Sequence, residues 1–232
     1  MTISYSALAA QEACQQFWHA TYVARTQEKS SQKSIRGVAA HDSIEQSVKD
    51  FVRFERPVTG FVGDVLHTLT EQTGSRAFMA EMWSAVKQDL TASKYGEVAW
   101  LRSKIDLVHF TSDGAVATVV DWKTGNYMPT KSSFDDTQLI IDAITLFGRP
   151  KIREVKAVFA YTKFEKILPS PPVHLTRDDV LGDKKEWRVI KIFDRLARYE
   201  LNAAKPKEEL TATPGPKCNF CPVAECPYNP GH

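Results

Sequence analysis

Apolar residues recur at helical spacing through the first part of the chain. The helices predicted from this spacing cover residues 4–24, 36–55 and 61–93. Gly74 marks a break in the third of these helices. The polar stretch 26–35, which separates the first two helices, predicts a loop. The first part of the chain is therefore expected to be mainly helical.

After residue 97 the pattern changes to runs rich in β-branched and aromatic residues. Strands are predicted over 98–110, 115–122 and 154–162, and helices over 134–147 and 184–204. The turn residues Ser112, Asp113 and Gly114 join the first two strands, so these strands are expected to pair as a hairpin. Helices and strands in this order predict an α/β fold.

Length and composition fit one globular domain. The chain has 232 residues, of which 43% are hydrophobic and 25% are charged, and a chain of this length buries a core without added staples. It has no run of 18 apolar residues, and its start lacks the basic and apolar segments of a signal peptide. We therefore expect a cytoplasmic protein with no membrane partner, in which cysteines serve metals more often than disulfides.

Charge is distributed unevenly although the net charge is only +2. Residues 37–148 contain ten Lys and Arg against fifteen Asp and Glu, and residues 149–205 contain fourteen against eight. On the predicted helix 184–204, basic side chains recur every three or four residues at Arg188, Lys191, Arg195 and Arg198. Such a stripe can follow a phosphate backbone and predicts DNA binding, although a solvated helix face has the same pattern.

The segment between Lys104 and Gly125 contains the most informative chemistry. Asp106 lies in the first predicted strand, and Asp121 and Lys123 lie at the end of the second, in VVDWKTG. Because strand side chains alternate, Asp121 and Lys123 share one face, and Asp106 can face them across the hairpin.

This combination suits the hydrolysis of a phosphodiester bond. Two carboxylates can hold Mg²⁺ or Mn²⁺ through oxygen ligands, and such a cation activates water and neutralises charge on the phosphate. A lysine two residues after the second carboxylate can orient that water or stabilise the developing charge. An isolated Asp-x-Lys is also a common exposed ion pair, so the strand context is what favours catalysis.

A histidine upstream of the hairpin adds a nitrogen ligand. His41 and Glu45 are four residues apart in a predicted helix, so they share a face. An imidazole can complete a mostly carboxylate site for Mn²⁺ or Mg²⁺. A lone histidine is more often an ordinary core or surface residue, so the assignment of His41 depends on the other motifs.

Taken in order, these segments resemble the motif set of a known family. GVAAHDSIE, KIDLV and VVDWKTG, followed by a glutamine, are similar to the motifs of the RecB-like branch of the PD-(D/E)XK nucleases over about residues 37–142. The resemblance implies a restriction-endonuclease-like core, with a mixed central sheet flanked by helices. In that family the histidine and two acids bind metal, the acids and the lysine serve catalysis, and the glutamine supports the site. The matching residues are His41, Asp106, Asp121, Lys123 and Gln138. Ser103 and Asp142 stand where the family often has Gly and Tyr.

The chain has four cysteines, one near its start and three near its end. They are Cys14, Cys218, Cys221 and Cys226. Four thiolates suffice for a 4Fe–4S cluster or for a tetrahedral Zn²⁺. Alternatively, Cys14 is a packed core residue and the tail is a zinc knuckle that uses His232 as its fourth ligand.

The sequence S-Y-S-A-L followed by a cysteine resembles the start of the iron–sulfur RecB-like nucleases. These include the AddB nuclease domain and the CRISPR-associated RecB-like exonucleases. The resemblance implies that Cys14 and the three C-terminal cysteines hold a 4Fe–4S cluster that joins the two ends of the chain. In the chain-entropy model, closing a loop of about 200 residues stabilises the fold by roughly 5 kcal/mol.

Together these features predict a metal-dependent deoxyribonuclease. Similar proteins imply an exonuclease on single-stranded or end-containing DNA, in replication, recombination, repair or CRISPR adaptation, with protein partners from such a system. Two alternatives stay open: a non-catalytic DNA-binding or assembly protein that keeps the fold, and a zinc-stabilised structural protein. A single domain over 1–232 is expected, with an N-terminal helix in 1–35, the core and basic helix in 36–205, and the cysteine segment in 206–232.

Overall fold

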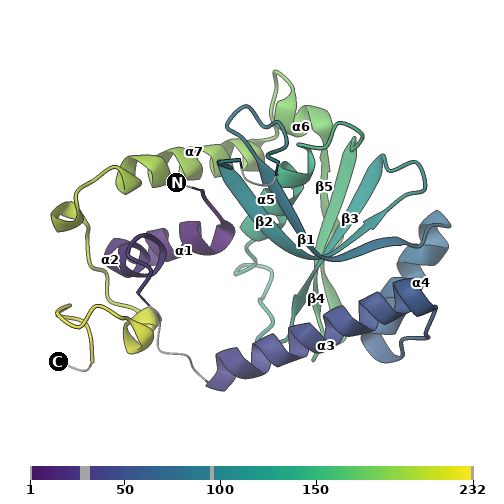
Figure 1. Cartoon of the computed structure of the whole chain (residues 1–232), viewed down its shortest axis with the longest axis horizontal. Coiled ribbons are helices and arrows are strands. Elements are labelled where there is room, and N and C mark those ends of the chain that lie inside the picture. The colour runs from purple at the N-terminus through teal and green to yellow at the C-terminus, as the bar shows by residue number, and fades with distance from the viewer. Residues whose placement is uncertain (1, 27–31, 95–96, 231–232) are drawn as a thin grey trace.

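The fold is a five-stranded sheet with helices on both faces (Figure 1). The structure is a computed structural model that describes residues 2–26, 32–94 and 97–230, without the side chains of 32–36. The strands follow one another across the sheet as β1 (Ala77–Val86), β2 (Leu101–Phe110), β3 (Val116–Lys123), β4 (Glu154–Tyr161) and β5 (Lys166–Thr176). All neighbours pair antiparallel except β3 and β4, which are parallel. This mixed central sheet confirms the predicted α/β class.

Helices precede, interrupt and follow the sheet. They are α1 (Tyr5–Ala13), α2 (Gln15–Trp18), the π-helix η1 (His19–Val23), α3 (Gln32–Phe54), α4 (Gly60–Thr73), α5 (Thr137–Leu146), α6 (Arg177–Leu181) and α7 (Trp187–Ala203). Two 3-10 turns follow at Lys207–Glu209 and Pro216–Phe220. None of the described helices is long and apolar enough to cross a membrane.

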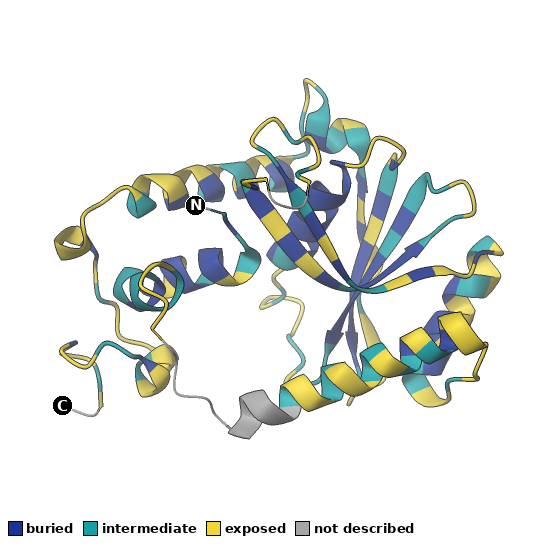
Figure 2. Ribbon diagram, viewed as in Figure 1, coloured by how far each residue is buried: buried dark blue, intermediate teal, exposed yellow. Residues whose placement is uncertain are grey.

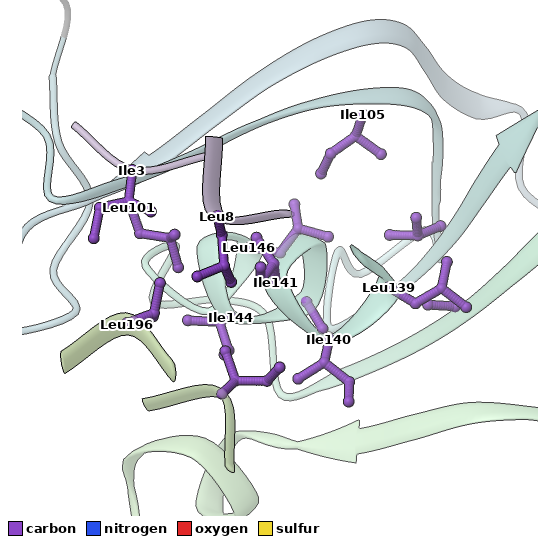
Figure 3. Packing of buried hydrophobic residues seen from close by; sticks show 14 of the residues in the cluster. Ile3, Leu8, Leu101, Ile105, Leu139, Ile140, Ile141, Ile144, Leu146 and Leu196 are labelled. Atoms are coloured by element: carbon purple, nitrogen blue, oxygen red, sulfur yellow. The ribbon is translucent and has the colours of Figure 1, made fainter. Parts of the chain in front are cut away.

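Two apolar clusters hold the layers together. The larger cluster joins one face of the sheet to α5, α1 and α7, and Figure 3 shows Leu8, Ile144 and Leu196 among its members. The smaller cluster joins the other face to α3 and α4. Helix α5 is buried along almost its whole length because it lies between the sheet and the helices outside it. The sheet is thus the middle layer of three.

At one point along β1 and β2 the side-chain alternation shifts, so that positions of the same parity face α3 and α4 on one side of this point and α5 on the other. Phe78 packs in the α3–α4 cluster, whereas Met82, four residues later, packs in the α5 cluster. Between them Glu81 has a φ of 51°, which is outside the range of a strand. The flanking register pairs, Ala80 with Leu107 and Met82 with Ile105, leave Glu81 across from Asp106. There β2 changes its face in the same way, with Leu107 in the α3–α4 cluster and Ile105 in the α5 cluster. A non-glycine residue in this conformation costs about 1–3 kcal/mol and often marks a functional site.

Several predicted elements are confirmed, and one is wrong. The hairpin, α5, β4 and α7 match the predictions within a few residues. The helix expected over 61–93 ends at Thr73, where Gly74 adopts a φ of 65° as the cap, and residues 77–86 form β1 instead. Almost every position of that segment is apolar or a helix former, so its pattern lacks period 2. Ladder pairing with β2 decides its conformation.

The long strand β5 has no counterpart among the predicted elements. Its sequence KILPSPPVHLT contains three prolines, which lack the N–H that a central strand must donate. The position of β5 at the edge of the sheet accommodates them, since one side of an edge strand needs no partner.

Two boundaries near the N-terminus differ from the predictions. The helix expected over 4–24 is interrupted at Cys14, whose φ of −166° is extended and which ends α1 and begins α2. Helix α3 begins at Gln32 rather than residue 36. Most of the loop predicted over 26–35 lies outside the described residues, which omit 27–31.

Candidate active site

A cleft of about 570 Å³ lies between the sheet, α3, α5 and the start of α1. The residues of the predicted site that line it are His41, Asp106, Asp121, Lys123 and Gln138. Tyr5, the first residue of α1, lines the same cleft. Residues far apart in the sequence are therefore brought to one opening.

Lys123, Asp121 and Gln138 form a closed triangle of polar contacts. The Lys123 Nζ lies 2.6 Å from Asp121 Oδ1 and donates a hydrogen bond of 2.9 Å to Gln138 Oε1. The amide nitrogen of Gln138 donates to the other oxygen of Asp121. Two residues at the end of β3 and one in the first turn of α5 thus fix one another. The Lys123 Nζ also lies 4.5 Å from the centroid of the Phe159 ring.

Asp121 is a buried carboxyl with a displaced pKa. Burial raises its pKa to about 6, nearby Lys123 opposes this rise, and Asp106 adds to it. The residue is only 5% exposed, so the charge of its carboxyl depends on the cations that face it. Lys123 stabilises the ionised form, and a metal cation in the cleft would stabilise it further.

Asp106 connects the triangle to α3. Its Oδ2 accepts a hydrogen bond of 2.9 Å from the backbone N–H of Trp122, in the strand that contains Asp121 and Lys123. The same oxygen lies 3.4 Å from His41 Nδ1. The hydrogen bond from His41 to Asp106 raises the pKa of this histidine. Glu45, which was expected to share its face, pairs with Lys49 instead and is not part of the cleft.

One further acidic residue joins this group and was not predicted. Ligand atoms of His41, Glu81 and Asp106 all lie within 4.8 Å of one another, and no other described set of three His, Cys, Asp or Glu residues does so. One imidazole nitrogen with carboxylate oxygens is a donor set that fits Mg²⁺ or Mn²⁺. Glu81 pairs with Lys104. The only sequence signal was an isolated acid within the apolar run AFMAEMW.

The two positions that differ from the family's usual residues contact each other. The Ser103 hydroxyl on β2 donates to the Asp142 carboxyl on α5. Both side chains are buried, and burial raises the pKa of Asp142 well above its usual value. The pair therefore ties α5, and with it Gln138, to the strand that contains Asp106.

The basic stripe of α7 is in part engaged within the protein. Arg188 pairs with Glu186 and with Asp136, next to the start of α5. Arg195 pairs with Glu12 of α1 and donates to Thr137. The other two members, Lys191 and Arg198, are exposed, and the ammonium of Lys191 lies 4.4 Å from the Trp187 ring centroid. DNA binding by this helix stays a prediction.

The four cysteines line a second cavity, of about 160 Å³. Backbone N–H groups donate to two of the sulfurs, from Thr213 to Cys14 at 3.5 Å and from Gly215 to Cys218 at 3.4 Å. Burial raises the pKa of Cys221, and the three other cysteines lie close enough to add to that effect. Cys14 therefore lies beside the C-terminal cysteines, as a metal centre that joins the two ends of the chain requires. His232 lies outside the described residues.

Comparison with known proteins gives one match that covers almost the whole chain. Residues 2–226 match the family model described as the PD-(D/E)XK nuclease superfamily. No curated protein matches significantly. A solved structure described as "Crystal structure of SSO0001" is 12% identical and covers 92% of this chain and 95% of its own, but its TM-score of 0.30 supports no argument. The extent of the family match and the sheet that positions the motif residues lead to one conclusion: the chain belongs to the PD-(D/E)XK nuclease superfamily.

Proposed function

We propose that the protein is a divalent-metal-dependent nuclease that hydrolyses DNA phosphodiester bonds, and that it acts as a RecB-like exonuclease on single-stranded or end-containing DNA. One observation carries the proposal. The lysine triangle of Asp121, Lys123 and Gln138 lines the same cleft as His41 and Asp106, two members of the ligand group. A group that can stabilise charge therefore lies beside groups that can hold a cation.

His41, Glu81 and Asp106 would hold Mg²⁺ or Mn²⁺, with the buried Asp121 facing the same space. When bound, such an ion lowers the pKa of its water and neutralises charge that develops on the phosphate. Asp106 is oriented for this role by the Trp122 N–H and by His41. Burial is the main cause of the raised pKa of Asp121, and a bound cation would favour the ionised form of this carboxyl.

Lys123 is the residue that we assign to charge stabilisation. Its Nζ is held by Asp121 on one side and by Gln138 on the other, so its position does not depend on substrate. A preorganised ammonium can orient the attacking water or stabilise the phosphate oxygen where negative charge increases. Gln138 acts through Lys123 and Asp121 and is a positioning residue.

We further propose that the cysteine cavity holds a 4Fe–4S cluster. Cys14, from the other end of the chain, lines one cavity with the three C-terminal cysteines. Four thiolates are the ligand set of such a cluster. The backbone N–H groups directed at Cys14 and Cys218 suit thiolates bound to such a cluster. Zinc is the alternative that metal analysis excludes or confirms.

Cleavage of end-labelled linear and of circular single-stranded DNA, with Mg²⁺ or Mn²⁺, tests the proposed activity. We expect degradation of the linear substrate alone. Asp121→Ala and Lys123→Ala should each lower the rate at least about 100-fold, as loss of a preorganised charge does, while circular dichroism shows an intact fold. Lys49→Ala is the matched control, because Lys49 forms an exposed ion pair outside the cleft.

Each outcome of this assay has a definite meaning. A folded Asp121→Ala or Lys123→Ala protein that cuts at the wild-type rate would refute the assigned site. Cleavage of the circle would make the protein an endonuclease and refute the exonuclease assignment. A wild-type protein that binds DNA without cutting it would favour the non-catalytic alternative.

A further inference from the structure

We propose that the exposed part of the sheet surface formed by the paired strands β1 and β2 is a binding track for single-stranded nucleic acid, with Trp83 as the platform for one unpaired base. The track is defined by Trp83, Arg102 and Lys104. It rests on the proposed function, because it states how a strand approaches the candidate active site.

Trp83 is exposed in a position where the neighbouring side chains are buried. Met82 and Ser84, on either side of it, face the α5 cluster at 4% and 6% exposure, whereas Trp83 is 61% exposed. Figure 2 shows this alternation of buried and exposed residues along the front of the sheet. A large aromatic ring left in solvent forgoes the burial that usually stabilises it, and unpaired bases stack on such rings.

Two basic residues lie on the same face as the ring, Arg102 and Lys104, and Lys104 is also paired with Glu81. Lys104 is the register partner of Trp83 on β2, and directly opposed residues of paired strands share a face. The guanidinium carbon of Arg102 lies 5.8 Å from the Trp83 ring centroid. An aromatic platform with positive charge beside it is the arrangement that binds single strands through stacking and phosphate contacts.

The track leads directly to the ligand group. Glu81 lies two residues before Trp83 on β1, and Asp106 lies two residues after Lys104 on β2. A strand rises about 3.3 Å per residue, so the backbone at Trp83 lies roughly 7 Å from that at Glu81. Lys104 spans this interval by pairing with Glu81. A base stacked on Trp83 would therefore place a neighbouring phosphate within reach of His41, Glu81 and Asp106.

Charge and position favour a nucleic acid over a protein partner on this surface. Exposed aromatic residues and arginines also occur at protein interfaces, but lysine is depleted there. Here Arg102 and Lys104 lie directly beside Trp83, and the surface continues into the cleft that we assign to phosphodiester hydrolysis. In a duplex the base faces are stacked on each other, so a tryptophan platform selects unpaired bases.

Binding of a dye-labelled oligothymidine, measured by fluorescence anisotropy without added Mg²⁺ or Mn²⁺, tests the track. Trp83→Ala should raise the Kd about 5- to 100-fold, as loss of one stacked base does, and Trp83→Phe should restore most of the affinity. Binding of a duplex of equal length should not change. Arg102→Gln should reduce the slope of log affinity against log salt by about 0.7.

Phe54→Ala is the matched control. Phe54 is 62% exposed and the Arg56 guanidinium lies 5.2 Å from its ring centroid, but it ends α3, about 20 Å along the helix from His41. Its substitution should leave oligonucleotide affinity unchanged. An unchanged Kd for Trp83→Ala, or an equal loss with the duplex, would overturn the proposal. So would a changed oligomeric state in light scattering with unaltered DNA binding, which would indicate a protein contact.

The failure of this proposal can be told apart from failure of the proposed function. Strand binding that depends on Trp83, in a protein that never cuts DNA, would leave the track intact and refute the nuclease. Cleavage by the wild type with no contribution from Trp83 would do the reverse.

Discussion

Asp121 shows how the fold changes the chemistry of a single residue. Its position at the end of β3 buries the carboxyl beside Lys123 and Gln138, and burial raises its pKa to about 6. The unfolded chain exposes the same carboxyl with a pKa near 3.8. Between these two values the folded protein binds a proton that the unfolded chain has lost, so the stability of the metal-free protein falls as the pH rises.

Asp121→Asn removes this penalty, and its effect should therefore depend on pH. In metal-free protein the substitution should stabilise the fold above pH 6, by up to about 3 kcal/mol for a shift of about two pH units. As the pH falls toward 3.8 the carboxyl becomes protonated in the folded and in the unfolded chain, and the advantage should shrink toward zero. Urea unfolding between pH 4 and pH 8 in a chelator measures it, with Asp50→Asn, at a half-buried ion pair of α3 outside the cleft, as the control. A difference that does not vary with pH would contradict the assigned pKa.

At the scale of elements, α7 has two kinds of basic residue. Arg188 and Arg195 pair with carboxylates next to α5 and in α1, so they fix the helix to its neighbours. Lys191 and Arg198 lie on the exposed face and leave their charges available to a phosphate. We therefore expect the two paired arginines to contribute to stability, and Lys191 and Arg198 to contribute to DNA binding.

Substitutions along α7 separate these roles. Arg195→Met should destabilise the fold by about 1 kcal/mol, because it removes a partly exposed ion pair with Glu12 and the hydrogen bond to Thr137, and it should leave the salt dependence of DNA binding unchanged. Lys191→Met and Arg198→Met should each flatten that dependence by about 0.7 and change stability by less than about 0.5 kcal/mol. Salt titrations and urea unfolding measure both effects. Equal changes in stability and in salt dependence for all three variants would contradict these separate roles.

At the scale of the whole molecule, the two ends of the chain are joined by more than cysteines. The Trp18 indole donates a hydrogen bond of 2.8 Å to the Tyr199 hydroxyl, and Gln16 donates to the backbone at Leu210. Helix α1 runs from Tyr5, in the active-site cleft, to Cys14, in the cysteine cavity. The N-terminal helix thus connects the two candidate metal centres.

Cys14→Ser tests whether a metal centre joins the ends. If it does, the variant should lose iron and acid-labile sulfide as Cys221→Ser does, and its Tm should fall by about 10 °C, because the unfolded chain is no longer constrained. The remaining hydrogen bonds between the ends should keep the variant folded. Full iron in anaerobically purified Cys14→Ser would make Cys14 a packing residue. Zinc in the wild-type protein would mean that a metal centre joins the ends but that it is a zinc site and not an iron–sulfur cluster.

Much of the site could be predicted from the sequence because its signals are local. The turn at Ser112–Gly114 and the alternation around Asp121 and Lys123 depend on neighbours within a few residues. The same holds for the helices that contain His41 and Gln138. The motif resemblance then indicated which residues belong to one site, and the structure places these residues in one cleft.

What the sequence could not determine depends on contacts between distant segments. The conformation of β1 is decided by pairing with β2, which also brings Glu81 into the ligand group. Prolines in β5 are tolerated only because the strand lies at an edge. Local patterns specify the elements, the faces they bury and the residues at their ends. The tertiary structure alone decides which charged side chains form ion pairs and which cations remain available for a ligand. Ion pairs and burial depend on distance in space rather than on separation along the sequence.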